Sequence, residues 1–186
     1  MDVNVGVSNR HIHLTEEDYR VLFGNVNIEI AKRIVQAGQF ASFSKVTIQT
    51  EKSELKNVRV LGPFRKYTQV EISKTDAFKL GINPPIRTSG DLTEAATVTI
   101  IGPSGRLKLP CCIIANRHIH MNEEEANRRG FVNKQTVSVT FNTEKPVTFH
   151  DVFIKVSSDG VYQMHIDTDD ANGSFIKDND IGNIIT

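Results

Sequence analysis

The feature that most constrains the fold is a repeat: SNRHIHL at 8–14 returns as ANRHIHM at 115–121, 107 positions later. Each copy is followed by an acidic segment, TEEDYRVLF at 15–23 and NEEEANRRG at 122–130, that opens with a helix-capping residue. Four of the six histidines lie in the two copies. A repeat that spans a strand end and a capped helix predicts two similar half-structures.

Most of the remaining chain alternates apolar and polar residues over short runs, the pattern of half-buried β-strands. Turn-forming Gly, Pro, Asn and Ser residues separate these runs. Short helices are expected at 74–80, ending at Gly81, and at 167–172, before Gly173. The whole pattern predicts a mainly β protein built as barrels or a sandwich. The alternating runs lie at 3–7, 46–48, 58–60, 70–72, 97–102, 105–110, 136–141, 147–156 and 161–167.

Composition excludes several classes of partner. Lys and Arg total 22, as do Asp and Glu, so no overall field attracts nucleic acid or an acidic membrane surface. The chain has no run of 18 apolar residues, and MDVNVGVSN lacks the pattern of a signal peptide. We therefore expect a soluble cytosolic protein. The adjacent Cys111 and Cys112 lie in an apolar run and are predicted to be core residues rather than a nucleophile or metal ligands.

The duplicated histidines predict metal binding. Side chains at i and i+2 of a strand point to the same face, so His11 converges with His13 and His118 with His120. Imidazole favours zinc first, with iron, copper and nickel behind it. The third ligand of each pair stays open: His165 and Glu71 are the candidates of interest, and the spacing does not choose between them. His150, in another alternating run, is expected to be a surface or structural residue.

Four motifs carry a resemblance to a known family. VGVSNRHIHL, VRVLGPFRKYTQVEISKTDAFKLGINPPIRTSGD, ANRHIHM and HIDTDDANG resemble the PduL-type phosphate acyltransferases, also called phosphate propanoyltransferases, in order and over essentially the whole chain. The resemblance implies acyl transfer between coenzyme A and phosphate. It also implies two zinc ions held between two β-barrels capped by short α-helices, with the first strand joining the C-terminal part. The domain boundaries would be 1–9 with 117–186 for one barrel and 10–116 for the other.

The resemblance also assigns residues. The metal ligands it implies are His11, His13 and Glu71 for one zinc, and His118, His120 and His165 for the other. Arg65, in GPFRK, would be the catalytic arginine that handles phosphate. For the coenzyme A phosphates we favour Arg87, which follows a rigid Pro-Pro and precedes a flexible Ser-Gly. Arg10 and Arg117, one before each histidine pair, are expected to brace the acidic helices at 15–23 and 122–130.

The expected reaction is direct attack of phosphate on the thioester carbonyl of acetyl-CoA or propanoyl-CoA, giving acyl phosphate and coenzyme A with no covalent acyl-enzyme. A homodimer is the family-level expectation. Members of propanediol-degrading microcompartments carry an N-terminal extension that targets them to the protein shell, whereas the first strand here is expected from residue 2. The protein is thus expected in the bacterial cytoplasm, or in a microcompartment lumen with shell association if such an extension was removed.

Three other classes remain as alternatives. A cupin-like single-metal protein is suggested by the spacing of His11, His13, Glu17 and Gly24, although Glu17 lies where a helix should start. A metal-dependent hydrolase also uses His-x-His, but (β/α)₈ barrels of that class need about 250 residues. A non-catalytic zinc module would normally use more cysteine.

Overall fold

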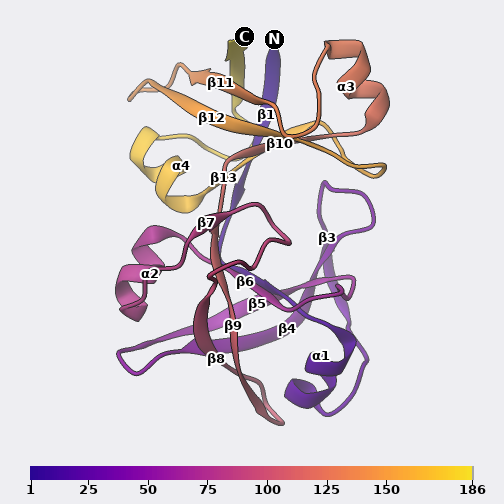
Figure 1. Cartoon of the computed structure of the whole chain (residues 1–186), viewed down its shortest axis with the longest axis vertical. Coiled ribbons are helices and arrows are strands. Elements are labelled where there is room, and N and C mark those ends of the chain that lie inside the picture. Colours follow the sequence, from indigo (N-terminus) through magenta and orange to yellow (C-terminus); the bar gives the residue numbers. More distant parts are fainter. Residues whose placement is uncertain (186) are drawn as a thin grey trace. The chain divides into compact units, whose positions relative to one another are not determined.

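The computed structural model describes residues 1–185 and is mainly β, as predicted (Figure 1). The chain forms two compact units. Unit 1 contains Met1–Asn9, Val35–Ala37 and the chain from Asn116 onward, and unit 2 contains Arg10–Ile34 and Gly38–Ala115. Among the described residues no helix is both long enough and apolar enough to cross a membrane.

Unit 1 is a closed six-stranded barrel in the order β1-β13-β10-β12-β11-β14. The apolar residues of its alternating strands, among them Val5, Ile119 and Met164, form one buried core. Helices α3 and α4 flank the strands in Figure 1. The bounds are β1 Asp2–Ser8, β10 His118–Met121, α3 Glu123–Arg129, β11 Thr136–Phe141, β12 Val147–Val156, β13 Gln163–Asp167, α4 Thr168–Ser174 and β14 Ile181–Ile185.

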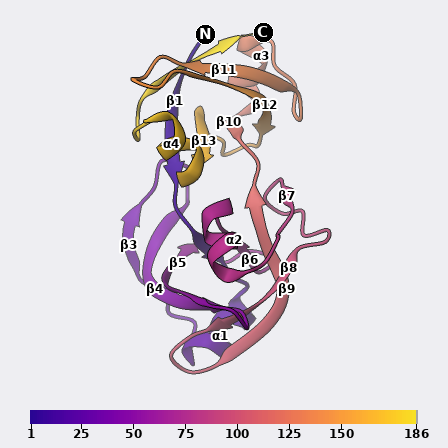
Figure 2. The same ribbon diagram turned by 90° about the vertical axis from the view of Figure 1, so that its left-hand side faces the viewer.

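Unit 2 contains a second closed ring of six strands, because β4-β5-β2-β6-β9 pair in sequence and β8 pairs with both β9 and β4. Strands β3 and β7 add to this ring at β4 and β9. Helix α1 lies at one end of the unit in both views, where the Ser104 amide donates to the Leu22 carbonyl (Figure 2). The bounds are β2 His11–His13, α1 Glu16–Phe23, β3 Ile30–Arg33, β4 Phe40–Gln49, β5 Glu54–Gly62, β6 Gln69–Glu71, α2 Lys74–Leu80, β7 Ile86–Arg87, β8 Ala96–Ile101 and β9 Arg106–Ala115.

The two barrels share one topology. In unit 2, β2 pairs parallel with β5 and antiparallel with β6, which pairs parallel with β9. In unit 1, β10 pairs parallel with β12 and antiparallel with β13, which pairs parallel with β1. The strand that precedes each His-Ile-His motif in the sequence therefore belongs to the other unit from the motif itself. The prediction of two similar half-structures is correct at the level of strand pairing.

One segment was not foreseen from the sequence. Val35–Ala37, from the middle of the chain, belongs to unit 1, and Asn116 joins that unit one residue before the predicted boundary. Gln36 is buried, donates its amide to the Val161 carbonyl and accepts from the Val161 N–H, both at 3.0 Å. The Gln36 side chain thus makes the pair of hydrogen bonds that a neighbouring strand would otherwise make. Because no strand is involved, the apolar periodicity of the sequence does not predict this contact.

The short helices have the predicted caps. The side chains of Thr15 and Asn122 accept from the backbone amides of Asp18 and Glu125. The last helix departs from the prediction, since α4 continues through Gly173 and ends with Phe175 in the left-handed conformation at φ 56°. The caps fix the direction in which the chain leaves each His-Ile-His strand.

Candidate metal centres

In unit 2, strand register brings together His11, His13 and Glu71. On the antiparallel pair β2 and β6, His11 lies opposite Glu71 and His13 opposite Gln69. One ligand atom from each of the three residues lies within 4.8 Å of the others, and all three are buried. His11 Nε2 is 3.5 Å from Glu71 Oε2. The group offers two imidazole nitrogens and one carboxylate oxygen.

The state of His13 suits a metal ligand. Burial, then the neighbouring His11 and Arg65, lowers its pKa to about 3, against the opposing effect of Glu71. The ring is therefore neutral near pH 7, the form that coordinates metals. Its Nδ1 is buried without a hydrogen-bond partner. An unpaired buried nitrogen is costly, and a cation at this position would satisfy it.

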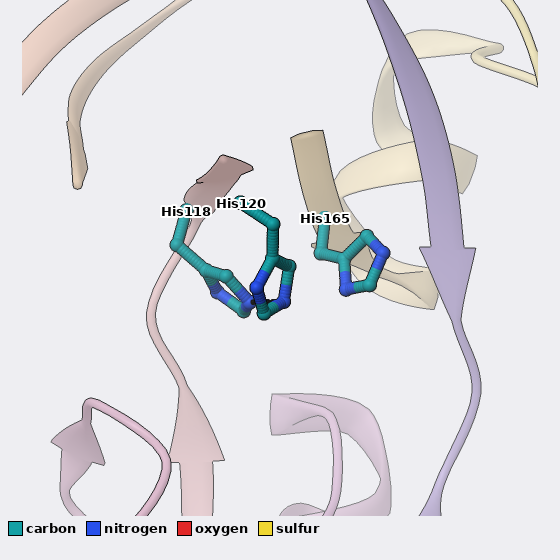
Figure 3. Close-up of side chains that lie close together, drawn as sticks. All are labelled: His118, His120 and His165. Carbon is teal, nitrogen blue, oxygen red and sulfur yellow. Dashed lines mark hydrogen bonds between the residues drawn. The ribbon is translucent and has the colours of Figure 1, made fainter. Parts of the chain in front are cut away.

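In unit 1, the equivalent register brings together three histidines (Figure 3). His118 and His120 project from β10, and His165 lies opposite His118 on β13. The His118 ring centroid lies 4.6 Å from that of His120 and 5.4 Å from that of His165, and the last two are 4.7 Å apart. One nitrogen from each ring lies within 4.8 Å of the others. This group offers three imidazole nitrogens.

Hydrogen bonds indicate which nitrogens of unit 1 are available. His118 Nδ1 lies 2.8 Å from the Asn116 carbonyl oxygen, which can only accept a hydrogen bond. Nδ1 therefore carries the proton, and Nε2 of the neutral ring carries the lone pair that can bind a metal. That Nε2 faces His120 Nε2 at 3.0 Å. His165 Nε2 lies 3.1 Å from Gln163 Oε1, an acceptor, which leaves Nδ1 of the neutral ring as the ligand atom. Such partners orient metal-binding histidines.

Both donor sets fit a divalent metal ion. Three nitrogens, or two nitrogens and a carboxylate oxygen, are the protein ligands of catalytic zinc sites, which keep a fourth position open. Among the described residues, these two are the groups whose ligand atoms converge in this way. The third ligands that the sequence left open, His165 and Glu71, each complete one group.

Arg65 lies near the unit 2 group, as its effect on the His13 pKa indicates. Its backbone amide donates to the Leu14 carbonyl. Its half-buried guanidinium donates to Gln39 Oε1 at 3.1 Å and to the Tyr67 hydroxyl at 3.4 Å. These contacts engage one hydrogen on each terminal nitrogen of the guanidinium, and the role of Arg65 toward phosphate stays a prediction.

Arg87 and the two motif arginines each contact an acidic side chain. Arg87 contacts its own loop through Thr93 and Glu94, so binding of coenzyme A by this residue stays a prediction. Arg10 donates to Asp76 of α2, and Arg117 to Asp170 of α4. The expectation that they brace α1 and α3 is wrong, because each reaches the helix that follows the strand carrying the third ligand.

The remaining candidates lie outside both groups. Cys111 and Cys112 are buried, and burial raises the pKa of the Cys111 thiol to about 12 and that of Cys112 further. They are core residues, as predicted. His150 is exposed and shares a hydrogen bond with Ser138. Glu17, which the cupin-like alternative needed, is exposed on α1, while His11 and His13 group with Glu71.

Two buried glutamines were missed. Gln69 and Gln163 lie opposite His13 and His120 in the two barrels, and each contacts the third ligand on its own strand. A signal was present in the sequence: Gln-Val-Glu at 69–71 and Gln-Met-His at 163–165 place a glutamine two residues before each third ligand. This second, shorter repeat accompanies the third ligands as the His-Ile-His repeat accompanies the first two.

Fold and site together define a class: a two-barrel protein with a three-ligand group in each barrel, of the kind that holds a catalytic metal ion. The sequence profile of phosphate propanoyltransferases matches residues 4–177. The phosphate propanoyltransferase of Thermotoga maritima is 46% identical over 184 residues, which cover 97% of this chain and 88% of that protein.

Two further relatives of the same name agree. Those of Lachnoclostridium phytofermentans and Salmonella arizonae are 45% and 44% identical, covering 99% and 95% of this chain and 86% and 85% of their own lengths. The chain therefore belongs to the phosphate propanoyltransferase family, as the four motifs predicted, and it is an acyltransferase.

Proposed function

We propose that the protein interconverts a short-chain acyl-CoA and phosphate with acyl phosphate and coenzyme A, using two zinc ions that act on one substrate. The observation that carries this proposal is the pair of three-ligand groups at equivalent register in a member of this family. Propanoyl-CoA is the first candidate because the relatives are named for propanoyl transfer, and acetyl-CoA is the second.

In this proposal His11, His13 and Glu71 hold one ion and the three histidines of unit 1 hold the other. Bound zinc would supply a Lewis acid that stabilises negative charge on the carbonyl oxygen and on the departing sulfur. The chain contributes the geometry: neutral rings with their second nitrogen engaged, as at His118 and His165, present a fixed lone pair.

Arg65 is proposed to orient phosphate. A guanidinium offers donors in a planar fork that matches two phosphate oxygens, which a lysine cannot reproduce. Gln39 and Tyr67 orient the Arg65 guanidinium through Nη2 and Nη1, each of which carries a second hydrogen. Fixing the nucleophile in this way lowers the entropic part of the barrier.

The transfer is proposed to be direct. A phosphate oxygen forms a bond to the carbonyl carbon as the carbon–sulfur bond breaks, and the sulfur leaves as thiolate with the bonding electron pair. A cysteine relay is disfavoured, because the raised pKa values of Cys111 and Cys112 keep both thiols protonated and burial removes them from substrate.

The cellular setting is also part of the proposal. We place the protein in the bacterial cytoplasm or in the lumen of a microcompartment, as a homodimer, with shell association only if a longer form carries a targeting extension. Neither nucleic acid nor a membrane is proposed as a partner, given the balanced charge of the chain.

The test follows thiol release from propanoyl-CoA and acetyl-CoA by zinc-loaded protein, with and without phosphate, and counts bound zinc in the same sample. Phosphate-dependent release with about two zinc ions per chain supports the proposal. Release without phosphate indicates a hydrolase, and a folded sample with one ion and no release indicates the single-metal alternative. Arg65→Lys is the matched variant, expected to lose about 10²-fold or more in kcat/KM at unchanged zinc content.

A further inference from the structure

Gln69 is a fully buried polar residue at the start of β6, opposite His13 in the strand register. Its side chain is 0% exposed, so each amide group needs a protein partner. Glu71, the third member of the unit 2 group, lies two residues further along the same face of the strand.

The amide of Gln69 connects Glu71 to a turn. Its Nε2 donates to Glu71 Oε1 at 2.6 Å and to the Ser89 hydroxyl at 2.8 Å. Its Oε1 accepts from the Gly90 backbone N–H at 2.7 Å. A backbone N–H only donates, so Gly90 fixes which end of the amide is oxygen, and both hydrogens of Nε2 are then used on Glu71 and Ser89.

These contacts divide the two oxygens of Glu71 between different partners. Oε1 accepts from Gln69, whereas Oε2 is the oxygen facing His11, at 3.5 Å. A cation held by the histidines would therefore meet the carboxylate through Oε2. The same amide holds the 88–91 turn, in which the Asp91 amide donates to the Thr88 carbonyl and Gly90 has φ +102°.

We propose that Gln69 is a positioning residue that limits Glu71 to one metal-binding oxygen, Oε2, and couples this carboxylate to the 88–91 turn. The inference rests on the proposed function, since the ion in question is the one proposed for unit 2. Gln69 would act on the ion only through Glu71, and the order of the 88–91 turn would depend on the same amide.

Gln163 supports the inference by contrast. It occupies the equivalent register in unit 1, but there its carbonyl oxygen faces the Nε2 of His165. Gln69 thus uses its N–H groups to occupy a carboxylate oxygen, and Gln163 uses its oxygen to occupy an imidazole N–H. In both barrels a glutamine engages one of the two possible ligand atoms of the third ligand, by opposite halves of the amide.

The test replaces each glutamine by methionine, which keeps length and apolar volume but removes the amide. Each variant is made in a background with one remaining group: Gln69→Met with His120→Ala, and Gln163→Met with His13→Ala. Cobalt(II) is the probe, because its visible absorption is stronger in four-coordinate than in five-coordinate sites. Chelator competition gives the affinity, and hydrogen exchange reports the 88–91 turn.

Gln69→Met is expected to weaken cobalt binding about 10- to 100-fold, the usual effect of losing a partner of a metal ligand. The cobalt absorption should also fall, because the freed Oε1 of Glu71 becomes a second ligand, and amides at 88–91 should exchange faster. Gln163→Met can weaken binding but should leave the absorption strength unchanged, since one imidazole offers one nitrogen to an ion. It should also leave exchange at 88–91 unchanged.

Ser89→Ala keeps the hydrogen bond between Gln69 and Glu71. It replaces Gln69→Met as the test of the turn if that variant does not fold. It should speed exchange at 88–91 without changing the cobalt spectrum. Wild-type affinity, spectrum and exchange in Gln69→Met would overturn the inference. If the His120→Ala background binds no metal, the proposed function of unit 2 fails, and unchanged exchange at 88–91 in Gln69→Met then separately overturns the coupling.

Discussion

The two barrels place different chemistry on the same strand register. His118 faces His165 across β10 and β13, and His11 faces Glu71 across β2 and β6. Strand order and the direction of every pairing in the two six-stranded rings also agree. The position of a three-ligand group is therefore set by backbone pairing, and its donor set by one residue on the neighbouring strand.

The two barrels differ in the size of the residue that lies beside the third ligand. On the parallel neighbour strand, Gly6 lies beside His165, whereas Ile113 lies beside Glu71. A Cβ on Gly6 would sit 3.2 Å from His165 Cδ2 and from two atoms of Gln163. The larger imidazole thus has a glycine neighbour, and the smaller carboxylate a branched one.

Charge differs as well. A divalent ion held by three neutral imidazoles keeps its full net charge, whereas a carboxylate such as Glu71 offsets part of it. In the proposed reaction the unit 1 ion would therefore attract anionic phosphate more strongly than the unit 2 ion, which leaves the departing thiolate to the unit 2 ion.

The largest effect is expected from removing one ligand in either barrel. His13→Ala and His120→Ala should each lose one zinc per chain and at least about 10²- to 10³-fold in kcat/KM, because both ions are proposed to act on one substrate. Zinc counting and the thiol assay measure both. His150→Ala is the control, since His150 is exposed and outside both groups. Half-activity in either ligand variant would show independent sites.

Filling the space beside His165 should separate the barrels. Gly6→Val places a side chain against His165 and Gln163, and overpacking of this kind typically costs about 1–3 kcal/mol. We expect weaker zinc binding in unit 1 and unchanged binding in unit 2, measured by chelator competition in single-site variants. Ile113→Val, the matched change in unit 2, should leave both sites intact. Unchanged unit 1 affinity in Gly6→Val would refute the steric account.

A smaller effect is expected at the arginines that precede the motifs. Arg117 makes two hydrogen bonds to Asp170, at 2.7 and 2.8 Å, and lies over the Phe149 ring. Both partners retain some exposure, so Arg117→Lys should cost about 1 kcal/mol, or about 2–4 °C in Tm. Arg10 donates one hydrogen bond to Asp76, so Arg10→Lys should lower Tm less in the same melting experiment. The reverse order would show that unit 2 depends more on its arginine.

The sequence predicted what local patterns and repeats encode. Alternation predicted the strands, caps such as Thr15 and Asn122 predicted the helices, and the His-Ile-His repeat predicted two convergent pairs. Strand pairing itself is not local: nothing in the spacing placed Glu71 opposite His11, and the resemblance named that residue before the register explained it.

Long-range polar contacts were the other gap. Arg10 and Arg117 were assigned to the nearest acidic helices, but their partners lie 66 and 53 residues away in the sequence. Gln36 joins unit 1 through Val161, 125 residues away. Such contacts have no periodicity, and a polar residue that becomes buried looks like a surface residue until its partner is known.

The smallest effect is expected from making the barrels more alike at a core position. Cys112 pairs with Val70 on β6, and Val5 takes the same register against Met164 on β13. Both are fully buried. Cys112→Val should therefore keep full activity and both zinc ions and change the free energy of unfolding by less than about 1.5 kcal/mol, as a near-isosteric core replacement does. Loss of turnover in a folded variant would indicate that Cys112 takes part in the reaction despite its burial and raised pKa. Such a result would contradict direct transfer.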